Sequence, residues 1–363
     1  MAELVWTEET SGIWAWHAES AGEFLDVLRR SNNCWWDDDA QSPWVFRGHR
    51  DKSWPLLPSA WRPDNQVIAS ARAEATQRFE RVNPKQGLRW SFGNHVTGQT
   101  GFGENDTELQ KRLTIEATAE LLPVYDFLLA CDRLGLAAPV QQLPPDPALS
   151  PDWLIGAVDP LVGDDFFRFS DIPHYISLAQ HHGIPTRLLD WTYDPIKAAF
   201  FAGGVTSDET AQADIAVWAI HRRRAMTVIG KPGIFPQMFD GKVEHGNNHS
   251  GIFPTIEIVR TPMRENFFLA AQSGQFTSIR GSGIDFMHRG GIRPSLEMLV
   301  AESGVKDVVL RKITLERRHV PELAKMLARE GISRSQLMPT HDNVAKDIIR
   351  NWSRDTKASP SLV

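Results

Sequence analysis

Two short segments, far apart in the sequence, hold the residues best suited to bind a small ligand. The first is Phe46-Arg47-Gly48, in which an arginine lies between an aromatic residue and a glycine. A guanidinium can form a two-pronged contact with a phosphate or a carboxylate, and a glycine lets the backbone approach a ligand closely. An isolated triplet of this kind can equally place Arg47 in a structural ion pair.

The second segment has the sequence GIPTRLLDWT and spans residues 183–192. Its glycine and proline indicate a rigid turn, and a helix is expected to begin directly after it. Polar groups in a loop that leads into a helix N-terminus are well placed to bind anionic or hydroxyl-rich ligands. The structural alternative is that Arg187 and Asp190 pair with each other, and that the preceding histidines satisfy a helix C-terminus. The candidate site residues here are His182, Thr186, Arg187, Asp190, Trp191 and Thr192.

The elements that must position these segments are a mixture of helices and strands. Amphipathic spacing predicts the helices, and short apolar runs predict the strands. Because helices and strands do not alternate regularly enough for a doubly wound sheet, the sequence predicts an α+β fold in which helices flank a small mixed sheet. Helices are expected over residues 19–30, 69–82, 171–182, 194–204 and 320–329, and strands over residues 44–48, 215–220, 275–280 and 308–315.

The composition changes between the two candidate segments. Glycine-rich and proline-rich stretches flank a helical pattern over residues 107–134, which Pro123 is expected to kink or split. We interpret residues 83–170 as a mostly helical insertion. The whole chain, residues 1–363, is then a single domain with core segments 20–82 and 171–350 and a tail over residues 351–363.

The overall composition is that of an ordinary globular chain, with 42% hydrophobic and 23% charged residues. A formal net charge of -6 gives no general reason to expect nucleic acid or an anionic membrane as the main partner. Two cysteines cannot build a disulfide framework or a cysteine-rich zinc site, and His245 and His249 are separated by a loop-like sequence, so no metal is expected. Without a secretory signal or a membrane-length apolar run, a cytoplasmic location is expected.

Tryptophan is unusually frequent near the start of the chain. The sequence holds 13 tryptophans and 3 tyrosines. Packing in the core is the favoured role of these rings, and stacking on a planar ligand is the alternative.

Further stretches extend the two candidate segments into a larger set of motifs. They are Phe46-Arg47-Gly48-His49 with Pro55-Leu56-Leu57-Pro58-Ser59 and Arg62, Glu74 and Phe79 in a helix, residues 179–202, Arg264 with residues 271–276, and residues 331–339. Together they resemble the FRG domain family, which is named for the Phe-Arg-Gly triplet. The resemblance runs from Ser20 to Arg350 and implies no established activity, because the family is largely uncharacterised.

A more distant similarity links the same segments to arginine-type ADP-ribosyltransferases. These enzymes pair an aromatic-Arg-Gly strand with a Ser-Thr-Ser strand that leads into a helix, and a later strand carries a catalytic glutamate. Phe46-Arg47-Gly48 resembles the first element, and Asp190-Trp191-Thr192 resembles a degenerate second one. The similarity implies an ADP-ribosyltransferase-like fold with NAD as substrate. Arg47 would neutralise the diphosphate, Thr192 would hold the nicotinamide ribose, and Trp191 would stack on nicotinamide.

The third element of that comparison lacks its glutamate. Gln272 and Gln275 occupy the corresponding stretch, and a carboxylate is what would stabilise an oxocarbenium-like centre. Asp190 is the candidate carboxylate, and Glu316, just after a later expected strand, is a weaker substitute. The alternative is a binding fold without transferase activity.

The leading hypothesis is an NAD-consuming enzyme, an ADP-ribosyltransferase or a glycohydrolase, acting as a bacterial toxin or a defence effector on an unknown protein or nucleic-acid acceptor. A second hypothesis is a non-catalytic module that binds a nucleotide-like small molecule, and a third is a hydrolase using His182 and Asp190 as acid and base. The candidate catalytic residues are Arg47, Asp190, Thr192 and His182, and the candidate NAD-binding residues are Phe46, Gly48, Thr186, Arg187, Trp191 and Gln272.

Overall fold

The computed structural model describes most of the chain as regular elements and short connections. The described residues are 4–37, 41–82, 104–138, 172–204, 213–230, 254–260, 271–280, 283, 285–286 and 289–355.

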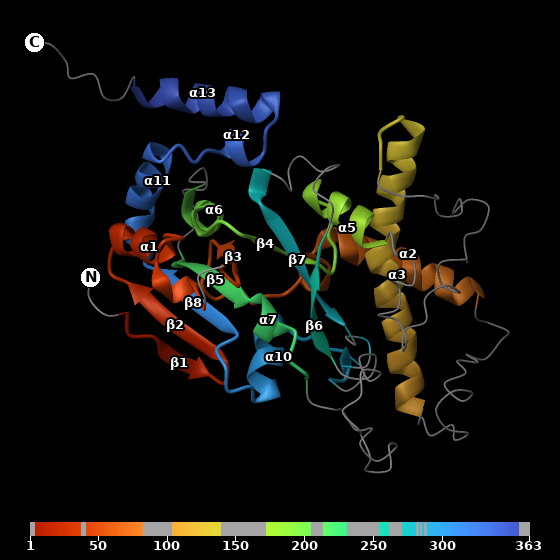
Figure 1. The fold of residues 1–363 in the computed structure, drawn as a ribbon. Coiled ribbons are helices and arrows are strands. Elements are labelled where there is room, and N and C mark those ends of the chain that lie inside the picture. Colours follow the sequence, from red (N-terminus) through yellow and green to blue (C-terminus); the bar gives the residue numbers. More distant parts are fainter. Residues whose placement is uncertain are drawn as a thin grey trace, which may run out of the picture.

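One mixed sheet organises the described part of the chain. Its strands are β1 (Thr7–Thr10), β2 (Ile13–Ala18), β3 (Trp44–His49), β4 (Leu189–Thr192), β5 (Ile215–His221), β6 (Thr255–Val259), β7 (Gly274–Arg280) and β8 (Leu310–Leu315). They form an eight-stranded sheet in the order β1-β2-β8-β5-β3-β4-β7-β6 (Figure 1). The β2–β8 pair is parallel, and every other neighbouring pair is antiparallel. The fold is therefore α+β as predicted, with a larger sheet than expected.

Helices cover both faces of this sheet. They are α1 (Ala21–Leu28), α2 (Gln66–Val82), α3 (Glu104–Arg133), α5 (Ile172–His181), α6 (Pro195–Ala199), α7 (Arg222–Ala225), α10 (Leu296–Ser303), α11 (Val320–Arg329), α12 (Arg334–Leu337) and α13 (His341–Asp355), with a π-helix at Phe200–Gly204 and short 3-10 helices at Asn33–Trp35, Ser59–Trp61 and Arg317–His319. Because side chains alternate along a strand, β3 sends Phe46 into one core and Val45 into another. The first core lies under α1, α6 and α11, and the second under α10.

A third core joins α2, α3 and α5 at the β6–β7 end of the sheet, on the right in Figure 1. The helix α3 lies within the expected insertion and continues through Pro123, so the expected split does not occur. Its neighbours Leu122 and Val124 are buried against this core, and that packing compensates for the hydrogen bond that a proline removes. Residues 83–103 and 139–170 of the expected insertion lie outside the described residues.

The remaining expected elements are found close to their predicted positions. The helices α1, α2, α5, α6 and α11 and the strands β3, β5, β7 and β8 are confirmed. The expected helix from Asp194 ends as the π-helix. The end of the segment 183–192, expected as part of the loop that leads into the helix, forms strand β4 instead, because buried Leu189 and Trp191 alternate with exposed Asp190. A strand at Asp190-Trp191-Thr192 is what the more distant resemblance implied. The elements β1, β2, β6, α7, α10, α12 and α13 were not predicted.

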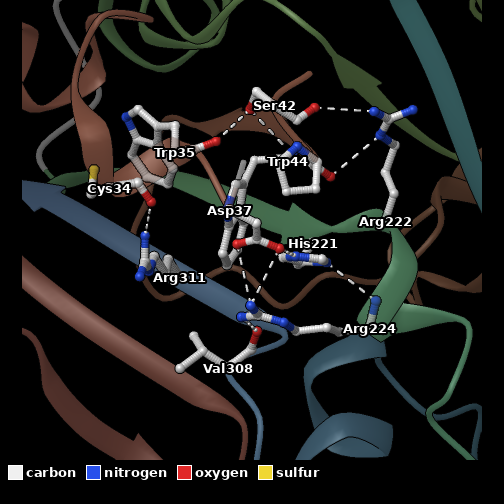
Figure 2. Close-up of polar contacts among 11 residues, drawn as sticks. Cys34, Trp35, Asp37, Ser42, Trp44, His221, Arg222, Arg224, Val308 and Arg311 are labelled. Carbon is white, nitrogen blue, oxygen red and sulfur yellow. Dashed lines mark hydrogen bonds and ion pairs between the residues drawn. The ribbon is translucent and has the colours of Figure 1, made fainter. Parts of the chain in front are cut away.

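Tryptophan packing is confirmed for the cluster around Trp35 and Trp44. Their ring centroids lie 5.8 Å apart in an edge-on arrangement, and the Arg311 guanidinium lies 4.8 Å from the Trp44 ring centroid. Figure 2 shows these side chains beside Asp37, whose carboxylate contacts both His221 and Arg224. These contacts hold residues 34–37, which precede β3, against the end of β5 and against α7.

No helix among the described residues combines the length and the apolar character needed to cross a membrane.

Candidate functional site

The two candidate segments meet where β3 and β4 stop pairing. The strand β3 is bridged to β4 at one position, Phe46 opposite Thr192, whereas it is paired with β5 along its whole length. A cavity of about 180 Å³ is lined by residues of both β3 and β4 and by the start of β7. The predicted site residues that line it are Phe46, Arg47, Gly48, Asp190, Trp191, Thr192 and Gln272.

Arg47 and Asp190 form an ion pair at the rim of this cavity. Arg47 Nη1 donates to Asp190 Oδ1 at 2.5 Å and to the Asp190 carbonyl oxygen at 2.9 Å. Arg47 Nε donates to His49 Nε2 at 3.1 Å, and Nη2 has no hydrogen-bond partner among the described residues. The Arg47 side chain is 13% exposed and that of Asp190 is 56% exposed. The arginine is therefore held in place while one of its nitrogens is left to bind a ligand.

The charges at the rim are fixed at neutral pH. The protein atoms packed around the Asp190 carboxyl act to raise its pKa even though the side chain is partly exposed. The charge and hydrogen bond of Arg47, with smaller contributions from the Asp190 backbone and His181, outweigh this effect and lower the pKa below its ordinary value. Burial, together with the charges of Arg47 and Arg62, lowers the pKa of His49 to about 3. A neutral His49 that donates from Nδ1 to the Trp54 carbonyl (3.2 Å) can accept from Arg47 at Nε2. The rim thus combines a carboxylate, a guanidinium and a neutral imidazole.

Two residues that line the cavity, Gln275 and His181, hold buried polar atoms without partners. Gln275, on β7, is 2% exposed, and neither its amide nitrogen nor its amide oxygen has a hydrogen-bond partner among the described residues. The same holds for Nε2 of His181, whose pKa burial lowers to about 4. Because buried polar groups in folded proteins nearly always have partners, such a concentration of unpaired atoms indicates a binding site.

Gly48 is required by packing. A Cβ atom at this position would lie 2.1 Å from the Ala198 carbonyl oxygen and 2.6 Å from the Ala202 backbone nitrogen. The backbone of α6 and of the π-helix therefore approaches β3 as closely as a glycine permits. The close approach expected between Gly48 and a ligand is used instead by the protein's own helix.

The Thr192 hydroxyl and the Gln272 backbone carbonyl are bonded to each other in the cavity wall. Thr192 Oγ1 donates to the Gln272 carbonyl oxygen at 2.6 Å and accepts from the Asp194 backbone nitrogen at 3.0 Å. The next residue, Ser273, has a left-handed backbone with φ of 52°, which is uncommon outside glycine. Lys197 Nζ holds this segment by donating to the Ala271 carbonyl oxygen and to Ser273 Oγ. The hydrogen of the Thr192 hydroxyl is thus already used within the protein.

Arg187 does not reach the cavity. It precedes β4 and points into the interior, where its Nε donates to Glu120 Oε2 at 2.8 Å, and Glu120 also accepts from Trp61 Nε1 at 2.8 Å. The expectation that Arg187 and Asp190 pair with each other is therefore wrong. The two residues lie on opposite sides of the chain as it enters the strand, and each has a partner from a distant segment.

Thr186 and His182 also lie outside the cavity. The Thr186 hydroxyl donates to Gln180 Oε1, and Gln180 Nε2 donates to Asp190 Oδ1 at 3.2 Å. Thr186 therefore positions the Asp190 carboxylate indirectly, through Gln180. His182 is exposed and stacks on Phe127 at a centroid distance of 5.7 Å. Its neighbour His181 is the histidine that lines the cavity.

Sequence reasoning did not assign roles to several other residues of the wall. Arg62 and Gln275 belong to quoted motifs but were not selected, and His49 follows the Phe-Arg-Gly triplet directly. Trp54, whose side chain is 45% exposed, is one of the many tryptophans near the start of the chain, and its neighbours in sequence did not mark it as a site residue. These additional lining residues are His49, Trp54, Arg62, His181 and Gln275.

Glu316, the weaker candidate carboxylate, is not among the cavity residues. It is paired with Arg318 at 2.8 Å beyond the end of β8. In the part of the chain that the structure describes, no group of three or more His, Cys, Asp or Glu residues is arranged to hold a metal ion.

Comparison with known proteins identifies the second candidate segment. The model of the FRG domain matches residues 165–211, a span that includes α5, β4 and α6. No curated protein and no solved structure matches the chain. The matched span supplies His181 and Asp190 to the cavity, and the Phe-Arg-Gly triplet on β3 faces them. The chain therefore contains an FRG domain, matched over residues 165–211.

Proposed function

We propose that the cavity binds a nucleotide-like ligand, with NAD as the candidate substrate. The observation that carries this proposal is the Gln275 carboxamide, which is buried with both its donor and its acceptor unpaired. A planar group with an adjacent donor and acceptor, such as the carboxamide of nicotinamide or the edge of a nucleobase, would satisfy both atoms together. Leaving a buried polar group unpaired costs about 1–3 kcal/mol, and a matching ligand would recover that free energy.

The charges of the rim favour a ligand that also carries an anion. Arg47 offers its free Nη2, and Arg62 lies in the same wall. A phosphate next to the planar group would contact these guanidinium groups. At about 180 Å³ the cavity is smaller than the about 300–1,000 Å³ of typical ligand sites, so it would hold one ring and its adjoining groups rather than a whole dinucleotide.

Asp190 is the carboxylate available for chemistry on such a ligand. When the N-glycosidic bond of NAD breaks, its electron pair leaves with the nicotinamide nitrogen and a cationic ribosyl centre remains. An ionised carboxylate stabilises such a centre until an acceptor oxygen or nitrogen bonds to it and releases a proton. With water as acceptor the reaction is NAD hydrolysis; with a protein or nucleic-acid group it is ADP-ribosyl transfer.

Nicotinamide release from NAD by the purified protein tests this proposal. We expect turnover in the unaltered protein and a loss of about 10²–10³-fold in Asp190→Asn, which removes one charge at the reacting centre. Asp26→Asn is the matched control, because Asp26 pairs with Arg29 on the surface, away from the cavity. Binding of NAD or nicotinamide mononucleotide without any release would exclude catalysis, and absence of binding would exclude the site.

A second candidate function is ligand binding without turnover. The observation that favours it is that Asp190 already accepts hydrogen bonds from Arg47 and Gln180, which reduces the charge it can offer to a substrate. A rise in melting temperature with ligand, with no nicotinamide released, would select this function.

A role as a toxin or a defence effector would follow from NAD consumption. Expression should then arrest growth and deplete cellular NAD, and Asp190→Asn should relieve both effects. Growth arrest that persists in this variant without NAD loss would contradict that role.

A further inference from the structure

A second cavity, of about 410 Å³, opens beside the first. Its wall includes Thr10 and Ile13 at the β1–β2 turn and Glu297 at the start of α10. Trp218 on β5 and Lys312 on β8 also line it. Trp54 lines both cavities and so forms a shared wall.

A row of side chains connects the two cavities across one face of the sheet. Arg47 on β3 is directly opposite Trp218 on β5, and Trp218 is directly opposite Lys312 on β8. Directly opposite residues on neighbouring strands point to the same face. Because strands lie about 4.8 Å apart, the backbones of Arg47 and Lys312 are separated by roughly 10 Å. Two cations therefore flank an indole ring along a line that leads from one cavity to the other.

Lys312 is the cation available in the second cavity. Its Nζ lies 5.0 Å from the centroid of the Trp218 ring, and it has no ion-pair partner among the described residues. The other lysine of this wall, Lys52, is already paired with Asp214 at 2.8 Å. An anionic group of a ligand would therefore be drawn to Lys312.

The other groups of this wall suit a nucleoside. Trp218 is 4% exposed, and its Nε1 has no hydrogen-bond partner in the described part of the chain. Trp54 is 45% exposed and presents an aromatic surface on which a base can stack. Glu297 accepts from the Leu56 backbone nitrogen at 3.0 Å. Burial raises the pKa of its carboxyl, and hydrogen bonds, together with the charge of Lys312, act against that rise. A carboxyl group at this position can accept bonds from sugar hydroxyls.

We propose that the second cavity binds the other nucleoside of a dinucleotide whose first end occupies the first cavity, with the anionic link lying between Arg47 and Lys312. This inference rests on the proposed function, because the first cavity would hold only part of such a ligand. The base would contact Trp54 and the Trp218 N–H, and the sugar hydroxyls would bind Glu297. This assignment gives a place to the second nucleoside of NAD, which the first cavity is too small to hold.

Calorimetric titration of the full chain with three probes tests this assignment. Nicotinamide mononucleotide represents the first cavity, AMP the second, and ADP-ribose spans from the second toward the first. We expect Lys312→Gln to weaken AMP and ADP-ribose binding by about tenfold, equivalent to about 1.4 kcal/mol, and to leave nicotinamide mononucleotide binding unchanged. Lys325→Gln, an exposed lysine on α11, is the matched control and should change none of the three. Lys312→Arg keeps the charge and should restore most of the AMP affinity.

Each outcome bears on one of the two proposals. If the unaltered protein binds nicotinamide mononucleotide but neither AMP nor ADP-ribose, the second cavity is not a nucleoside site, whatever the variants do. Equal weakening of all three probes by Lys312→Gln would also overturn the assignment. AMP binding that depends on Lys312, without any binding of nicotinamide mononucleotide, would support the second cavity and overturn the proposed role of the first.

Discussion

Replacing Arg47 with methionine separates its role in binding from its role in folding. The substitution keeps an unbranched stem and removes the guanidinium that contacts Asp190 and His49. Because the Asp190 side chain is 56% exposed, its carboxylate would be hydrated once the arginine is gone. We therefore expect the free energy of unfolding to fall by about 1 kcal/mol or less, the range of a solvent-accessible ion pair. A fully buried pair broken in this way would cost about 3–5 kcal/mol.

The same substitution should have a much larger effect on ligand binding. A hydrogen bond to a charged group contributes about 1.5–3 kcal/mol, which corresponds to a loss of affinity of roughly ten- to hundredfold. Nicotinamide mononucleotide is the suitable probe, because it is small enough to report on the first cavity alone.

Urea denaturation followed by circular dichroism and calorimetric titration measure the two effects on one sample. Arg72→Met is the matched control, because Arg72 pairs with Glu116 at 2.6 Å away from the cavity and should lower stability slightly without changing affinity. A stability loss above about 3 kcal/mol with unchanged affinity would refute the reasoning, since Arg47 would then be a purely structural residue.

Three further substitutions or conditions test other parts of the structure. Gln275→Leu replaces a buried, unpaired amide with an apolar side chain, so it should leave stability unchanged or raise it by about 1 kcal/mol in urea denaturation while abolishing ligand-induced stabilisation; a large loss of stability would contradict the unpaired amide. Glu120→Gln neutralises the buried carboxylate that pairs with Arg187 and Arg293 and should lower stability by about 3–5 kcal/mol, whereas Glu116→Gln, nearer the surface, should cost about 1 kcal/mol or less. The pKa of His49 is depressed from 6.5 to about 3, so the unfolded chain takes up its proton first as pH falls; His49 should therefore reduce stability as pH drops from about 6.5 toward 4, and His49→Gln should flatten that part of a pH series of melting temperatures. An unchanged slope in the variant would show that His49 is not a source of the pH dependence.

The sequence by itself determined the elements whose signals are local. The helix α11 has the predicted limits, Val320–Arg329, because its apolar residues recur with helical spacing over ten consecutive residues. The strand β3 was recognised from an aromatic run that ends near a glycine, and the start of α6 from the capping Asp194 and the proline after it. The motifs around Arg47 and Asp190 were also recognisable, since they depend on residue order alone.

Tertiary structure alone decided which of these residues share a cavity. Arg187 and Asp190 are three residues apart, yet one binds Glu120 in the interior and the other binds Arg47, 143 positions away in sequence. The two neighbouring histidines are also separated by the fold: His181 lines the cavity, whereas His182 stacks on Phe127 outside it. Strand β4 is only four residues long, too short for its periodicity to be read, and its direction is fixed by pairing with β7. Side-chain direction in so short a strand depends on that long-range register, which no local pattern encodes.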